Sequence, residues 1–126
     1  MAVSGEYKAF IADLLEPLGQ VHIRNMFGGA GVYQADIMFG LIADETLYLK
    51  VADLNKAAFE EEGMQPFVYR PASGKSVAMS YWQVPDRLYD EPDELLAWAR
   101  IAADVARSQK AGTAKPKSRA KKKRRA

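Results

Sequence analysis

VHIRNMFGGAGVYQADIMFGLIADETLYLKV, residues 21–51, is the stretch that decides the fold of this chain. β-Branched and aromatic residues recur in it in short runs, and turn-prone pairs at 28–29, 35–36 and 44–45 separate the runs. Connections this short indicate an antiparallel meander. We predict strands near residues 21–27, 30–35, 37–43 and 46–51, and the first two form either separate strands or one long strand bent at the glycines.

Helical patterns flank this stretch on both sides. Residues 5–18 carry apolar side chains at helical spacing, and Pro17 and Gly19 end that pattern. The remaining predicted elements are a helix over 54–62 capped by Asp53 and closed by Gly63, strands at 67–70 and 76–83, and a last helix over 91–107. The order α-β(3–4)-α-β(2)-α predicts an α+β fold in which helices cover one face of an antiparallel sheet.

Charge is divided unevenly along the chain. Residues 108–126 hold nine of the eighteen Lys and Arg side chains and no acid, whereas residues 1–107 hold the other nine and all sixteen acids, a net charge of −7. We therefore predict a folded domain, 1–107, and a disordered basic tail, 108–126, which either binds nucleic acid without sequence specificity or only aids solubility. The tail residues expected to bind phosphate are Lys115, Lys117, Arg119, Lys121, Lys122, Lys123, Arg124 and Arg125.

Composition excludes several classes of protein. The chain has no cysteine, which rules out disulfides and thiolate chemistry, and its single histidine leaves little with which to build a metal site. No apolar run approaches the roughly 20 residues of a membrane span, and the N-terminus lacks a signal-peptide pattern. We expect a cytoplasmic protein that uses no metal or cofactor and makes no membrane contact.

MFGGAGVY, residues 26–33, is the most unusual local string. Three glycines in four positions indicate a bulge or a close approach between backbones, and the alternative is a loop that binds an anion or a small ligand. No Lys-Ser/Thr pair follows, so the string is not a P-loop. The candidates for a ligand site or an interface at this bend are Phe27, Gly28, Gly29, Gly31 and Tyr33.

Other candidate sites have simpler structural explanations. Any Ser-His-Asp relay would have to use His22, but no Gly-x-Ser-x-Gly string occurs in the chain. The acidic clusters at 60–62 and 90–94 end one predicted helix and begin another, where carboxylates are solvated or complement a helix dipole. Aromatic residues on the strands would serve packing rather than base stacking, because the domain is acidic. We therefore predict no catalytic residues and no enzyme activity.

Six strings occur in series over roughly residues 5–107. They are M-F-G-G-A-G-V-Y (26–33), M-F-G-L-I-A-D (38–44), L-Y-L-K-V (47–51), F-E-E-E-G-M-Q-P-F (59–67), Met79-Ser80-Tyr81 with Val84-Pro85, and E-L-L-A-W-A (94–99). Together they resemble the N-terminal domain of the TfoX (Sxy) family, whose members regulate competence genes in bacteria. Beyond these strings, where full-length competence regulators have a second helical domain, this sequence has the basic tail.

The resemblance implies a fold like that of secretion chaperones, with the element order α-β-β-β-α-β-β-α and a tendency to form dimers. It also implies a transcriptional coactivator that works through partner proteins and not an enzyme, and it transfers no catalytic motif. The first hypothesis is a non-enzymatic, transcription-associated regulatory module that forms a homodimer, binds an unknown protein and holds nucleic acid with its tail. The alternatives are a chaperone-like adaptor that binds a peptide, with an incidental tail, and a small-ligand binder at the Gly28–Gly31 bend.

Overall fold

The computed structural model describes residues 5–26, 29–70 and 74–113. The helices are α1 (Gly5–Leu15), α2 (Asp53–Glu61) and α3 (Pro92–Thr113), with short 3₁₀ helices η1 (Glu16–Leu18) and η2 (Asp86–Asp90). The strands are β1 (Val21–Met26), β2 (Gly29–Gln34), β3 (Ile37–Ala43), β4 (Thr46–Lys50), β5 (Pro66–Tyr69) and β6 (Val77–Gln83).

All six strands form one sheet in the order β1-β2-β3-β4-β6-β5, and every neighbouring pair is antiparallel. The predicted α+β class and the predicted order of elements are therefore confirmed. The glycine-rich segment separates two paired strands, β1 and β2, so the choice between two strands and one bent strand is settled in favour of two. Four strands precede α2, one more than the secretion-chaperone order implies.

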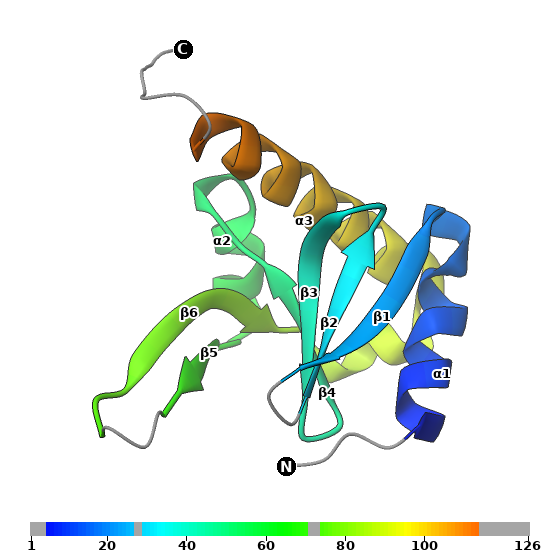
Figure 1. Ribbon diagram of the computed structural model, residues 1–126, viewed down its shortest axis with the longest axis horizontal. Coiled ribbons are helices and arrows are strands. Elements are labelled where there is room, and N and C mark those ends of the chain that lie inside the picture. The colour runs from blue at the N-terminus through cyan, green and yellow to red at the C-terminus, as the bar shows by residue number, and fades with distance from the viewer. Residues whose placement is uncertain (1–4, 27–28, 71–73, 114–126) are drawn as a thin grey trace.

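One face of the sheet, which we call the inner face, carries the hydrophobic core. Helices α1 and α3 pack on this face, and α2 packs against α3 beside the sheet (Figure 1). A register shift between Val32 and Tyr33 leaves Phe39 in the core and turns Met38 toward the opposite, outer face. The strand residues that are fully buried in this core are Ala30, Val32, Phe39, Ile42, Leu47 and Leu49.

Helix α3 is longer than the sequence pattern predicts. We expected it to end at residue 107, but it continues to Thr113 and takes in the first residues assigned to the tail. The buried apolar stripe of α3 ends at Ala106, and Gln109, Lys110 and Ala111, which follow it, are residues of good helix propensity. The remainder of the proposed tail lies outside the described residues.

The start of α2 also differs from the prediction. Asp53 is its first helical residue rather than its cap. The amide of Ala52 donates instead to Asn55 Oδ1 at 2.9 Å, and Asn55 Nδ2 donates to the Lys50 carbonyl at 3.0 Å. These bonds explain why Asn55 is buried although it is polar. The predicted closure at Gly63 is confirmed, since this residue has a φ of +76°.

Arg87 joins the two acidic clusters of the sequence. Its guanidinium lies 2.6 Å from Glu62, 2.8 Å from Glu94 and 3.4 Å from Glu91, and so links the end of α2 to the first turn of α3. Hydrogen bonds from Arg87 lower the pKa of Glu94 to about 2. The clusters thus support the packing of helices, although all three carboxylates remain accessible to solvent.

The pairing of β2 with β3 requires a glycine at position 29. A Cβ on this residue would overlap the carbonyl oxygen of Ile42 on the neighbouring strand. We expect Gly29→Ala to lower the free energy of unfolding by about 1–3 kcal/mol, because β2 and β3 must move apart to accept the methyl group. Urea unfolding followed by tryptophan fluorescence measures this loss. Gly5→Ala is the matched control, since a Cβ there meets nothing within 4 Å, and equal losses in both variants would contradict the explanation.

Candidate functional site

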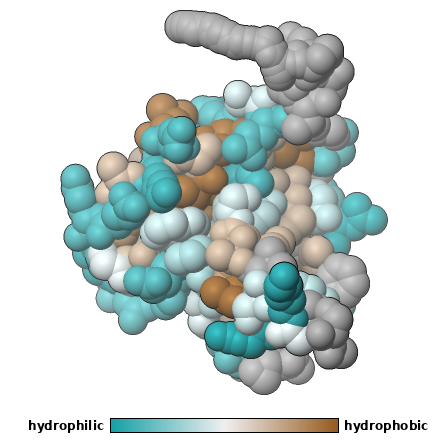
Figure 2. All heavy atoms as spheres, turned by 90° about the vertical axis from the view of Figure 1, so that its left-hand side faces the viewer, coloured by the Kyte–Doolittle hydropathy of each residue, from teal (hydrophilic) through white to brown (hydrophobic). Residues whose placement is uncertain are grey.

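The outer face of the sheet holds a half-open groove of about 530 Å³. The β5–β6 hairpin projects away from the rest of the sheet and forms one wall (Figure 1), and β1, β2 and β3 form the other. The space-filling view toward this hairpin shows tan and brown apolar surface among hydrophilic residues (Figure 2). This volume lies within the range of about 300–1,000 Å³ that is common for ligand sites.

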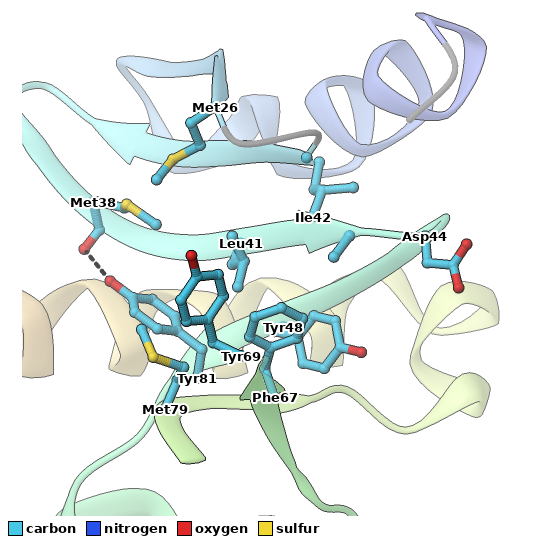
Figure 3. Close-up of a pocket in the computed structure, with 12 residues that line it drawn as sticks. Met26, Met38, Leu41, Ile42, Asp44, Tyr48, Phe67, Tyr69, Met79 and Tyr81 are labelled. Carbon is cyan, nitrogen blue, oxygen red and sulfur yellow. Dashed lines mark hydrogen bonds between the residues drawn. The ribbon is translucent and has the colours of Figure 1, made fainter. Parts of the chain in front are cut away.

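Methionine and aromatic side chains dominate the groove. In Figure 3, Met26 and Met38 lie on one side, and Phe67, Tyr69 and Met79 of the hairpin lie on the other. The large apolar and aromatic side chains that line the groove are those of Met26, Met38, Leu41, Tyr48, Phe67, Tyr69, Met79 and Tyr81. Flexible thioethers and flat rings adapt to apolar partners of different shapes.

Gly31 leaves room for two methionine side chains in the wall formed by β1, β2 and β3. A Cβ on Gly31 would lie 2.9 Å from the sulfur of Met26 and 3.2 Å from that of Met38. The Met26 and Met38 thioethers therefore lie over β2 at Gly31, in space that the side chain of any other residue at this position would occupy. Gly29, from the same glycine-rich string, lines the groove itself.

Contacts between strands hold the aromatic side chains in place. The Tyr81 hydroxyl donates to the Met38 carbonyl at 3.4 Å (Figure 3), and the Tyr48 and Phe67 rings meet edge to face at 5.1 Å. Burial raises the pKa of both Tyr48 and Tyr81 above the usual value, and the nearby Asp44 carboxylate adds to the effect on Tyr48. Both phenols are therefore neutral hydrogen-bonding groups at physiological pH.

The two ends of the groove differ in charge. Over residues 5–26, 29–70 and 74–113, Asp44 is the only charged side chain in the groove lining, and Figure 3 shows it at one end, beyond Tyr48. Near the other end, Lys50 Nζ lies 5.0 Å from the centre of the Tyr81 ring and donates to Ser80 Oγ at 2.7 Å. Burial lowers the pKa of Lys50. Lys50 does not itself line the groove.

The structure brings together some of the predicted site residues. Tyr33 lies near the groove, with its ring stacked on His22 at 5.4 Å and the Arg24 guanidinium 5.5 Å from the ring centre. Gly29 lines the groove, and Gly31 lies beside the sulfurs of two methionines that line it. Phe27 and Gly28 lie outside the described residues, as do the tail candidates Lys115, Lys117, Arg119, Lys121, Lys122, Lys123, Arg124 and Arg125.

The other candidates of the sequence analysis lie apart from the groove. His22 Nε2 lies 2.7 Å from the Ala35 carbonyl oxygen at the surface, outside the groove lining. Over residues 5–26, 29–70 and 74–113, no group of three or more His, Asp or Glu side chains is placed to hold a metal ion. In the same ranges, no helix is long and apolar enough to cross a bilayer.

The Tyr81 hydroxyl provides a test of this geometry. Its raised pKa means that the folded state holds the phenolic proton more tightly than the unfolded chain does. This contribution to stability is complete below a pH of about 10 and is lost as the pH rises above it. We expect the stability of Tyr81→Phe to fall less steeply above that pH than the stability of the unaltered protein. Chemical unfolding across alkaline pH measures the difference, and identical slopes would contradict the burial of this hydroxyl.

Comparisons with known proteins support the resemblance found in the sequence. The DNA transformation protein TfoX1 of Aliivibrio fischeri is 29% identical over 98 residues, and Protein Sxy of Escherichia coli is 24% identical over 98 residues. Each alignment covers 78% of this chain and 46% of the relative, so the chain spans about half the length of the curated relatives that it matches. Residues 13–106 match the family described as the TfoX N-terminal domain, and the chain therefore belongs to that family.

Proposed function

We propose that this protein is a non-enzymatic regulatory module of the TfoX N-terminal type, associated with transcription in the cytoplasm. It acts through protein contacts, including contacts with a second copy of itself, and its basic tail holds the assembly on nucleic acid without sequence specificity. The observation that carries the proposal is the outer sheet face, which no described helix covers and which presents apolar side chains without a catalytic set.

Family membership supports a regulatory role, but it does not identify the pathway, because the relatives are about twice as long as the matched region. The apolar groove also favours the second hypothesis, a chaperone-like adaptor that binds a peptide. The two differ in their use of the tail, since an adaptor has no need of nucleic acid. The remaining alternative, a small-ligand binder at the glycine bend, is supported by the position of Gly29 in the lining of the groove.

The tail is expected to account for nearly all affinity for nucleic acid. Residues 1–107 carry a net charge of −7 and repel phosphate, while the nine cations of the tail release counterions when they bind. Each duplex phosphate neutralised contributes about −0.9 to the slope of log K against log salt, so the engagement of roughly five to seven cations gives a slope of about −4.5 to −6. Fluorescence anisotropy at several salt concentrations measures this slope.

Replacing Lys121, Lys122, Lys123, Arg124 and Arg125 with alanine is the matching variant. We expect a much flatter salt slope and little change in thermal unfolding, because the core of the described residues is built between Ile11 and Ala106. DNA and RNA duplexes of different sequence should bind with similar affinity. If the five-alanine protein bound nucleic acid as tightly as the unaltered chain, the sheet face and not the tail would be the binding site.

Self-association is expected through the projecting hairpin. β5 is an edge strand of four residues, and its Val68 side chain is 37% exposed. Exposed strand edges readily pair with another chain. Light scattering should give twice the 14.0 kDa chain mass for the unaltered protein and the mass of one chain for Val68→Glu. Ile101→Glu on α3, where the side chain has similar exposure, is the control and should keep the mass of two chains. If the unaltered protein had the mass of one chain at high micromolar concentration, this prediction would be refuted.

A further inference from the structure

The groove has the chemistry of a site for a small apolar ligand. Three methionines, three tyrosines, Phe67 and Leu41 line it, and its volume is about 530 Å³. Methionine side chains adjust their shape to an apolar guest at little cost, because they are unbranched and flexible. The faces of aromatic rings also attract organic cations. An apolar molecule with a positive charge therefore suits these walls better than an anion does.

Charge complementarity points the same way. Of the described residues that line the groove, Asp44 alone is charged, and it is exposed, so a hydrated cationic group can reach it. Lys50, near the opposite end, already donates to Ser80 and does not line the groove.

The shape of the groove favours an elongated guest. The lining extends from Asp44, just before β4, to Tyr81, which pairs with Lys50 at the far end of that strand. It therefore runs along the length of Thr46–Lys50, about 13 Å. The protein's own tail is a poor candidate, because residues 114–126 contain no apolar side chain larger than Ala and Pro. The occupant is therefore a separate molecule.

We propose that the groove binds an elongated apolar molecule with a cationic end, whose apolar body lies against the methionines and rings and whose charge lies beside Asp44. The inference deepens the proposed function by naming a ligand for the outer face, and it rests on that proposal only in treating this face as a binding surface. Ligand binding is measured on the purified protein alone, so its failure would leave the tail and the hairpin predictions unaffected.

The test uses the methionine methyl groups as reporters. The full chain, labelled with ¹³C at these methyl groups, is titrated with decyltrimethylammonium below the concentration at which it forms micelles. We expect saturable shifts of the Met26, Met38 and Met79 signals. Met64 is an internal control, because it packs against the core and does not line the groove. Decanoate, which has an apolar chain of similar length and the opposite charge, should bind at least about threefold more weakly.

Two variants measure separately what the charge of Asp44 and the space in the groove contribute to binding affinity. Asp44→Asn should weaken the binding of decyltrimethylammonium about threefold and remove most of the difference from decanoate. Asparagine suits this position, since Asp44 has a φ of +57° and asparagine tolerates that region. Leu41→Trp should fill the groove and weaken both probes about tenfold. The matched controls, Asp90→Asn in η2 and Ile101→Trp on α3, should bind as the unaltered protein does.

Several outcomes would overturn the inference. They are the absence of saturable shifts at the three methionines, equal affinity for the two probes, and shifts at Met64 that match those in the groove. A Lys-containing apolar peptide that shifts the three signals when decyltrimethylammonium does not would assign the groove to a protein partner instead.

Discussion

The close packing of α3 against the inner face of the sheet is the contact on which the rest of the structure depends. Ala99, Ala102 and Ala103 are buried at this contact, and their small side chains let the helix lie near the strands. α1 packs beside α3 on the same face (Figure 1). The described helices therefore lie on one side of the sheet and leave the outer face, with its groove, uncovered.

Much of the fold could be predicted because local patterns and tertiary packing agree. Short runs of β-formers between turn pairs located every strand to within a residue or two, and the stripe at 5–18 located the first helix. The helical segments that the sequence analysis did not predict are those with few or no apolar residues to reveal them. Residues 108–113 extend α3 past Ala106, the last residue of its buried apolar stripe, and η2 (Asp86–Asp90) has a single buried apolar residue, Leu88.

The site was harder to predict than the fold. The glycines of 26–33 were recognisable as unusual, and two of them do shape the groove. The other lining residues, such as Met38, Tyr48 and Met79, are spread over separate strands, and only the pairing of β3 with β4 and of β4 with β6 brings them together. Their one sequence signal was that the strands carry apolar residues at both alternating positions, which indicates a sheet with two apolar faces.

The central claim is that the outer face, and not the helical side, makes the contacts of this protein in the cell. Photo-crosslinking tests it directly, with a photoreactive phenylalanine derivative placed either at Tyr69 in the groove wall or at Ile101 on α3. These side chains are 47% and 41% exposed, so both positions report on accessible surface. We expect discrete crosslinked products from position 69 and none from position 101. Products from position 101 alone, or equal products from both, would contradict it.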